Sequence, residues 1–147
     1  VPPQPHVMEL EMMTPLRLLK HKRLMQPDRF EWEFFIRTLV RRITSLAYFH
    51  QNHEETIDFN ALFANAAEHQ IVQKLVFEQN HRYSNRQKKE IPLDGLKGVM
   101  ELKFTKQDDP LWPWIWMGQY THNGKSTVMG LGQYQLKNGL VHQPKTS

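Results

Sequence analysis

The chain has 147 residues, which is enough for one domain with its own core and short for two. Its 19 lysines and arginines against 15 aspartates and glutamates give a formal charge of +4, and the absence of cysteine excludes disulfides and thiolate metal sites. No apolar run approaches the roughly 18 residues of a membrane span, and the first residues lack the features of a signal peptide, so we expect a soluble, cytoplasmic protein.

The first elements are expected to be a strand and a long helix. Residues 1–6 contain three prolines and are interpreted as a linker or as the remnant of an upstream domain. Residues 7–19 alternate apolar side chains with glutamates, which predicts a strand. Asp28 can cap a following helix, and Glu31 would complete a capping box. The helix is expected over residues 29–50, because apolar residues recur there at three- and four-residue spacing.

The middle of the chain predicts a short helix and a β-hairpin. Asp58 or Asn60 can start a helix that ends near His69. Residues 71–77 and 96–104 have the composition and alternation of two paired antiparallel strands. The polar, basic segment between them is then expected at the hairpin.

The last elements are expected to be a helix and a strand. Asp108 or Asp109 would start a helix that has Pro110 in its first position, and residues 127–136 would form the strand. Residues 7–141 therefore predict one α+β domain of the ferredoxin-like βαββαβ type, an antiparallel four-stranded sheet with helices on one face, followed by a tail at 142–147. This layout serves RNA recognition, metabolite sensing and metal carriage, so it does not assign a function.

Basic residues gather in three groups along the chain. Such groups favour a polyanionic partner more than the net charge does, because the local field attracts phosphates, although a solvated surface is the ordinary explanation of any one group. The groups are Arg17 to Arg23, Arg37 to Arg42, and His81 to Lys89.

Residues 118–136 (GQYTHNGKSTVMGLGQYQL) form the most informative segment. They predict a small, basic, hydroxyl-rich turn that suits phosphate oxygens, because backbone N–H groups of small residues can converge on an anion while Lys125 adds charge. A nucleotide-binding P-loop is excluded by spacing, since position 119 is Gln where that motif needs Gly.

Several segments together resemble a known family. Besides residues 118–136, they are residues 13–18 (MTPLRL), 35–43 (FIRTLVRRI) and 82–87 (RYSNRQ). Over residues 7–136 the chain resembles the RAMP superfamily, and more narrowly the C-terminal domain of the CRISPR-associated endoribonuclease that processes precursor CRISPR RNA. Ser126 departs from a position where that family usually has glycine, and Gln133 from one where a basic residue is common.

The resemblance implies an RNA-binding domain of a metal-independent endonuclease in antiviral defence, which binds and cleaves CRISPR repeat RNA. The ribose 2′-OH would attack the adjacent phosphate without a cofactor or a metal ion. The partners implied are repeat RNA, an upstream ferredoxin-like domain that carries most of the cleaving residues, and other CRISPR effector or adaptation subunits. The alternatives are a non-catalytic scaffold subunit or domain that holds RNA in a CRISPR ribonucleoprotein or fusion protein, and a small-molecule sensor of the same fold.

Two surfaces are predicted to contact RNA. The hairpin combines cationic, hydroxyl and aromatic groups that suit backbone contact and base stacking, although a merely solubilising hairpin is the alternative. His21 and His122 are candidates for acid–base catalysis because histidine titrates near neutral pH, but neither has an identifiable partner in the sequence. The predicted RNA-contacting residues are Arg82, Tyr83, Ser84, Arg86 and Lys88 in the hairpin, and His122, Asn123, Gly124, Lys125, Ser126, Thr127, Gly130 and Gly132 in the turn.

Overall fold

The computed structural model describes the backbone of residues 1–51, 57–79, 81–84 and 89–138, and side chains over 1–46, 57–79 and 91–137. The strands of the main sheet are β1 (Val7–Leu16), β4 (Gln70–Glu78), β7 (Gly95–Lys103) and β8 (Tyr134–Asn138). The helices are α1 (Trp32–Gln51), α2 (Phe59–Ala66) and α3 (Trp112–Thr121). Short elements complete the chain: β2 (Leu19–Lys20), β3 (Arg23–Leu24), β5 (His81–Ser84), β6 (Lys89–Pro92) and the 3₁₀ turns η1 (Pro27–Arg29) and η2 (Thr127–Met129).

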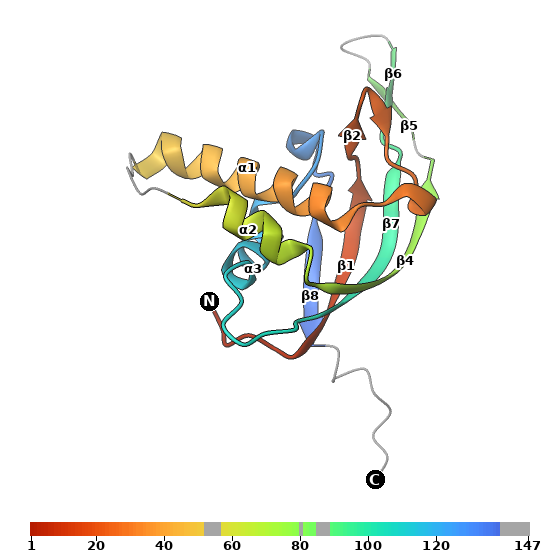
Figure 1. The fold of residues 1–147 in the computed structure, drawn as a ribbon. Helices are drawn as coiled ribbons and strands as arrows, with labels where there is room; N and C mark the ends of the chain where they lie inside the picture. Colours follow the sequence, from red (N-terminus) through yellow and green to blue (C-terminus); the bar gives the residue numbers. More distant parts are fainter. Residues whose placement is uncertain (52–56, 80, 85–88, 139–147) are drawn as a thin grey trace.

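The main sheet confirms the ferredoxin-like prediction. Its strand order is β4-β7-β1-β8, and each described pair is antiparallel. Strands β1 and β4 are therefore parallel to each other with β7 between them, which is the split βαβ arrangement. Figure 1 shows the three helices on one face of this sheet, while the other face carries no helix.

The alternation along β1 explains why one face is covered. Met8, Leu10 and Met12 are at most 2% exposed, and Glu9 and Glu11 between them point to the open face. The apolar stripe of α1 packs on this buried row and includes Phe35, Ile36, Leu39 and Val40, each fully buried. The core thus lies between the sheet and α1.

The predicted start of the long helix is wrong by three residues. Pro27 to Arg29 form a separate 3₁₀ turn, and Phe30 is extended, with φ −65° and ψ 131°, so the turn cannot continue into α1. The first N–H bonded into the helix is that of Phe35, which donates to the carbonyl of Glu31 at 3.1 Å. Asp28 is therefore not the cap. Asp58 caps α2 as predicted, because its carboxylate accepts from the Ala61 N–H at 3.1 Å.

The start of the aromatic helix is also later than predicted. Asp108 has φ 53°, a left-handed value that a helix cannot contain, and α3 begins at Trp112. The proline in its first turn is consequently Pro113 and not Pro110.

The last strand begins seven residues later than predicted, at Tyr134 instead of Thr127. Ser126, Gly130 and Gly132 have φ values of 62°, 86° and 77°, which are left-handed and incompatible with an extended strand. Residues 123–133 form instead a folded loop that contains η2; we call it the glycine-rich loop.

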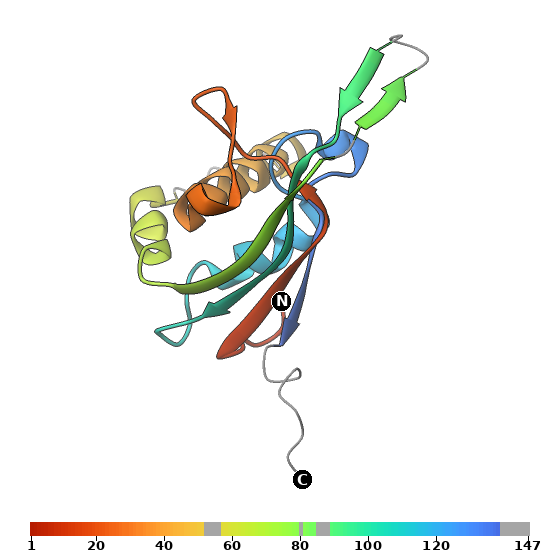
Figure 2. The same ribbon diagram turned by 90° about the vertical axis from the view of Figure 1, so that its right-hand side faces the viewer.

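The predicted hairpin between the two middle strands is confirmed. Strand β4 pairs with β7, and the connection between them contains the paired strands β5 and β6, which project beyond the sheet (Figure 2).

A buried polar network joins α1, α2 and the segment before α3. The indole N–H of Trp32 donates to Nδ1 of His69 at 3.0 Å, and Nε2 of His69 lies 2.7 Å from Oδ2 of Asp109. Asn65 donates its amide to the same carboxylate, as does the Leu111 N–H. Since an indole can only donate, Nδ1 accepts, so Nε2 carries the proton and donates to Asp109. His69 is thus held as one neutral tautomer.

Tyr134 anchors β8 to α3. Its hydroxyl donates to the carbonyl of Ile115 at 2.6 Å, and its ring lies against Phe35. Complete burial raises the pKa of Tyr134 well above its ordinary value of 10.0, because the phenolate would be desolvated. Gly118 leaves the space for this hydroxyl, since a Cβ there would lie 1.8 Å from the oxygen.

Candidate nucleic-acid interface

Basic side chains from three separate parts of the chain line one cavity of about 300 Å³. The walls are the end of β1, the outer side of α1 and the start of the glycine-rich loop. We call this cavity the basic groove; it is lined by Arg17, Leu18, Leu19, Phe34, Arg37, Thr38, Arg41, Gly124 and Lys125. Four cations and no carboxylate are among these residues, so the groove is suited to an anion.

The helix α1 places two of the cations. Arg37 and Arg41 are four residues apart on the exposed side of α1, so they lie one turn from each other and repel. The guanidinium of Arg37 lies 4.5 Å from the centroid of the Phe63 ring. Neither arginine forms an ion pair with a carboxylate of the described residues. A bound polyanion would relieve the repulsion between these two guanidinium groups.

The end of β1 and the glycine-rich loop complete the groove. Asp94 fixes the side chain of Arg17. The guanidinium donates to the backbone carbonyl of Asp94 at 2.8 Å and lies 3.4 Å from the Asp94 carboxylate. The Lys125 N–H donates to the carbonyl of Arg17 at 2.8 Å, which ties the loop to the strand end. The Lys125 side chain is exposed and extends the row of positive charge.

Asn123 and Gly132 hold the glycine-rich loop in shape. Asn123 is fully buried; its amide donates to the carbonyl of Phe35 at 3.0 Å, and its Oδ1 accepts from the Gly124 N–H at 2.8 Å. The Asn123 N–H donates to the carbonyl of Gly132, and the Gly132 N–H to that of Pro15, both at 2.9 Å. The side chain of Asn123 is therefore occupied by the fold.

The prediction that backbone N–H groups of this loop converge on an anion is wrong for most of the loop. The N–H groups of residues 123–125 and 129–132 each donate to an acceptor within the protein. Those of Ser126, Thr127 and Val128 are not so engaged among the described residues, and they lie at the outer end of the loop next to Gly130. Positive side chains, and not a nest of amides, give the groove its charge.

The two candidate histidines lie in different places. His21 is exposed in the turn between β2 and β3, with φ 51°. His122 ends α3 with φ 62° and is partly exposed. No described side chain forms a hydrogen bond with either ring, and neither residue lines the basic groove. The structure therefore does not assemble a two-histidine site from them.

The hairpin residues are placed only in part. Arg82, Tyr83 and Ser84 lie on β5, whose backbone pairs with β6, but their side chains lie outside the described part of the chain. Arg86 and Lys88 lie outside it altogether. The described residues contain no group of three or more histidines or carboxylates placed to hold a metal ion, and no helix among them is long and apolar enough to cross a bilayer.

The family model of the CRISPR-associated endoribonuclease Cas6 matches residues 10–134, most of the chain and all of the basic groove. The chain belongs to the Cas6 family. This confirms the resemblance that the motifs indicated. A search of curated proteins found no match.

Solved structures of Cas6 proteins share the fold. A product complex of Cas6 (TTHB231) is 14% identical with a TM-score of 0.66, covering 92% of this chain and 52% of that chain. Cas6 (TTHB231) of Thermus thermophilus is 14% identical with a TM-score of 0.63, covering 92% and 55%. A partial Cas6-RT-Cas1–Cas2 complex is 18% identical with a TM-score of 0.66, covering 95% and 24%. The chain thus spans about half of a Cas6 chain and about a quarter of the larger one.

The basic groove also contains residues that the sequence reasoning did not include among the predicted RNA contacts. Arg37 and Arg41 were recognised as part of a basic group that favours a polyanionic partner, but they were not predicted as individual RNA contacts. The signal that could have found them is their four-residue spacing on the polar side of α1, together with the absence of a compensating acid at the intervening turn.

Proposed function

We propose that this chain is the RNA-binding domain of a Cas6 endoribonuclease that processes CRISPR RNA, and that its basic groove holds the RNA sugar–phosphate backbone. The convergence of Arg17, Arg37, Arg41 and Lys125 on one cavity supports this proposal most directly. Phosphate contacts supply most of the affinity of such interfaces, and the exposed guanidinium groups of Arg37 and Arg41, which form no ion pair with a described carboxylate, are suited to them. Lys125 and Gly124 are the predicted turn residues that line the groove, while Asn123 and Gly132 support it from beneath.

The hairpin β5–β6 is a second proposed contact. It projects beyond the sheet and carries Arg82, Tyr83 and Ser84 on its first strand (Figure 2). Cationic and aromatic side chains at a projecting tip suit the backbone and the unstacked bases of a folded RNA.

Cleavage is proposed to need an upstream ferredoxin-like domain. The matched Cas6 chains are about twice as long as this one, and His21 and His122 have no acid–base partner among the described residues. In the whole protein, a ribose 2′-OH would attack the adjacent phosphate, giving a 2′,3′-cyclic phosphate and a 5′-hydroxyl without a metal ion. The groove would then keep the substrate in place while groups elsewhere transfer the protons.

A second candidate function is a domain that holds RNA inside a fusion protein or ribonucleoprotein without cutting it. The similarity to a chain of the partial Cas6-RT-Cas1–Cas2 complex, of which this chain covers 24%, favours such a setting. Other CRISPR subunits, including adaptation subunits, would then be partners.

The test measures RNA affinity and scission for the double variant Arg37→Ala/Arg41→Ala. The probe is a fluorescent RNA hairpin with single-stranded flanks, incubated in EDTA over a range of salt concentrations. Two lost phosphate contacts should weaken binding about tenfold and reduce the slope of log K against log salt by about 1.4. Cyclic-phosphate products would favour the nuclease, and retention without scission the holding domain.

The control carries the same loss of charge on the opposite side of the sheet. Lys74 and Lys103 are exposed on the strands β4 and β7, on the face without helices. Replacing both with alanine should leave the affinity within about twofold, because distant surface charges are screened. Equal losses in the two double variants would refute the groove and leave only a general charge effect.

A further inference from the structure

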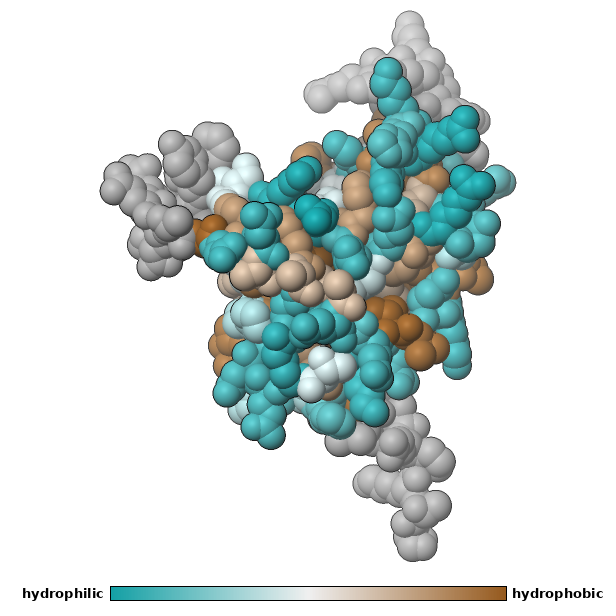
Figure 3. Space-filling view, viewed as in Figure 1, coloured by the Kyte–Doolittle hydropathy of each residue, from teal (hydrophilic) through white to brown (hydrophobic). Residues whose placement is uncertain are grey.

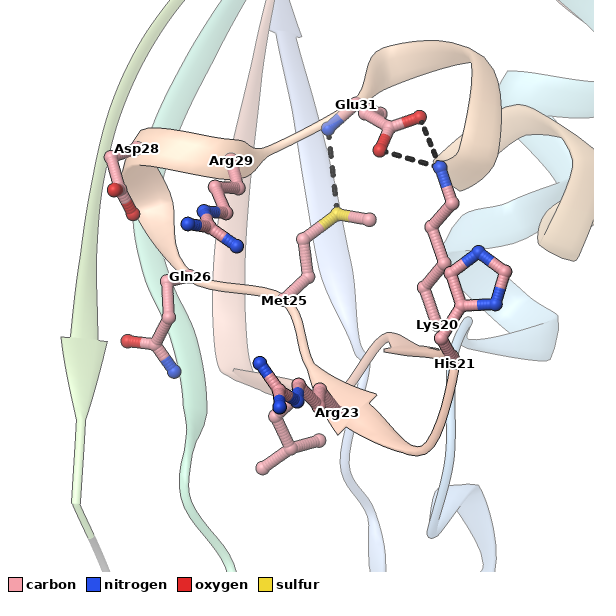
Figure 4. A pocket seen from close by; sticks show the side chains of 9 residues that line it. Lys20, His21, Arg23, Met25, Gln26, Asp28, Arg29 and Glu31 are labelled. Carbon is pink, nitrogen blue, oxygen red and sulfur yellow. Dashed lines mark hydrogen bonds and ion pairs between the residues drawn. The ribbon is translucent and has the colours of Figure 1, made fainter.

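A second and larger cavity, of about 820 Å³, lies beside the basic groove. It is bounded by the β2–β3 hairpin on one side and by the η1 turn on the other (Figure 4). Its lining residues are Lys20, His21, Arg23, Leu24, Met25, Gln26, Asp28, Arg29 and Glu31. We call it the hairpin pocket. Its volume falls in the range of pockets that hold small organic ligands.

The charges of the hairpin pocket are only partly compensated. Lys20 is bound to both carboxylate oxygens of Glu31, at 2.8 and 2.7 Å. Arg23 and Arg29 are exposed and form no ion pair with a described carboxylate. Figure 4 shows their guanidinium groups on the pocket side of the hairpin and of the turn, with Met25 between them. Two arginines therefore remain available for an anion.

The other lining groups suit a base more than a bare anion. Gln26 is exposed and offers an amide that both donates and accepts, and the carboxylate of Asp28 accepts. Leu24 and the buried Met25 provide an apolar floor. These groups match the parts of a nucleotide. The guanidinium groups suit its phosphate, the amide and the carboxylate suit the edge of its base, and the apolar surface suits the face of its base.

The hairpin is held in an unfavourable arrangement that presents these cations. His21 and Lys22 have φ values of 51° and 63°, as a two-residue type I′ turn requires, yet neither is the glycine or asparagine that such turns prefer. Lys20 pairs directly with Arg23 across the hairpin; Glu31 compensates the charge of Lys20, while Arg23 forms no ion pair with a described carboxylate. Local stability would favour other residues at each of these positions, so a bound polyanion gives a reason for them.

The pocket adjoins the basic groove. Nζ of Lys20, in the pocket, lies 5.8 Å from the ring centroid of Phe34, which lines the groove. Leu19 lines the groove and the next residue lines the pocket. In Figure 3, hydrophilic side chains lie over α1 and over the side of the molecule that carries β2, with hydrophobic patches among them. One strand can therefore reach both.

We propose that the hairpin pocket binds one nucleotide of the same RNA strand whose backbone lies in the basic groove. Arg23 and Arg29 hold its phosphate, and the base lies over Met25 with its edge toward Gln26 and Asp28. The Lys20–Phe34 contact separates the two sites. This inference rests on the proposed RNA-binding function and extends it by a site with its own residues.

The test compares the wild type with Arg23→Ala/Arg29→Ala on single-stranded oligouridylates from about 4 to about 16 nucleotides long. In the wild type, affinity should rise steeply once the RNA spans both sites, because the second contact becomes intramolecular. The variant should lose that rise, bind the longest RNA at least fivefold more weakly, and show a salt slope lower by about 1.4. The side chain of neither arginine forms a hydrogen bond or an ion pair with another described residue, so thermal unfolding should remain unchanged.

Two further variants separate the possible failures. If Arg37→Ala/Arg41→Ala weakens binding at every length while Arg23→Ala/Arg29→Ala changes nothing, the hairpin pocket is refuted and the RNA-binding function stands. If neither double variant differs from the Lys74→Ala/Lys103→Ala control, both proposals fail. Gln26→Ala, which removes no charge, should weaken binding of the longest RNA and leave the salt slope of that binding unchanged. An unchanged affinity for this RNA would overturn the proposed contact between Gln26 and the base.

Discussion

The glycine-rich loop offers a matched pair of substitutions that separates backbone conformation from packing. Gly130 and Gly132 have φ values of 86° and 77°, so alanine is strained at either position. A Cβ at Gly130 would have no atom within 4 Å, whereas a Cβ at Gly132 would lie 1.7 Å from the carbonyl oxygen of Asn123. The two variants therefore share the conformational cost and differ only in the space available.

The expected magnitudes follow from that difference. A left-handed alanine costs about 1–2 kcal/mol, which is the whole effect expected for Gly130→Ala. Gly132→Ala adds about 1–3 kcal/mol because backbone must move to admit the methyl group. The hydrogen bond from the Asn123 N–H to Gly132, at 2.9 Å, would also be lost, at about 1 kcal/mol. We expect a total of about 3–6 kcal/mol, a large part of the stability of an ordinary domain.

Urea unfolding followed by circular dichroism measures both variants, and RNA affinity is measured where each is folded. Gly132→Ala should weaken RNA binding as well, because a displaced Asn123 moves the adjoining Lys125 out of the groove. Gly130→Ala should retain that affinity. Equal free energies of unfolding for the two variants would refute this reasoning, since the close contact between Gly132 and Asn123 would then make no difference to stability.

Three further predictions concern the core and the groove. His69→Ala should destabilise the protein by about 1–3 kcal/mol in thermal or urea unfolding, because it removes one hydrogen bond to the buried Asp109 carboxylate and leaves the indole N–H of Trp32 without its acceptor. Asn123→Ala should lower the free energy of unfolding by about 1–3 kcal/mol, whereas Lys125→Ala should lower it by less than about 0.5 kcal/mol. The salt dependence of RNA binding should respond in the opposite way: only Lys125→Ala should lower its slope, by about 0.7. Tyr134 should resist ionisation in an ultraviolet titration, because its pKa is raised in the folded protein. The stability that Tyr134 contributes is fully present below pH 10 and falls as the pH rises above it, because the unfolded chain then releases the phenolic proton and the folded protein does not.

The sheet and the helices could be predicted because their signals are periodic. Burial alternates along β1 as the sequence alternates, and the stripe of α1 recurs at helical spacing. The errors lie at element boundaries, where backbone conformation at single residues decides. Phe30, Asp108 and Ser126 adopt conformations that stop or delay an element, and nothing in their chemistry requires those φ and ψ values.

The groove could be predicted only in part, because it depends on tertiary proximity. Lys125 was recognised from its own turn, but its neighbours Arg37 and Arg41 lie more than eighty residues away in the chain. The sequence gives the charge of each segment and not the distances between them. Asn123 was predicted as a contact residue because it lies in the same small, basic turn as Lys125, whereas its position beneath the loop, bonded to Phe35, follows from packing that no local pattern contains.

The pair His69 and Asp109 resembles catalytic machinery more than any other group among the described residues, and its geometry argues against that role. A general base must reach a substrate proton with a free nitrogen lone pair. Nδ1 of His69 already accepts from Trp32 at 3.0 Å, Nε2 donates to Asp109 at 2.7 Å, and both side chains are fully buried. The pair therefore fastens α1 and α2 to the segment before α3. If the whole protein cleaves RNA as proposed, proton transfer would have to come from exposed groups, on this domain or on the one proposed upstream.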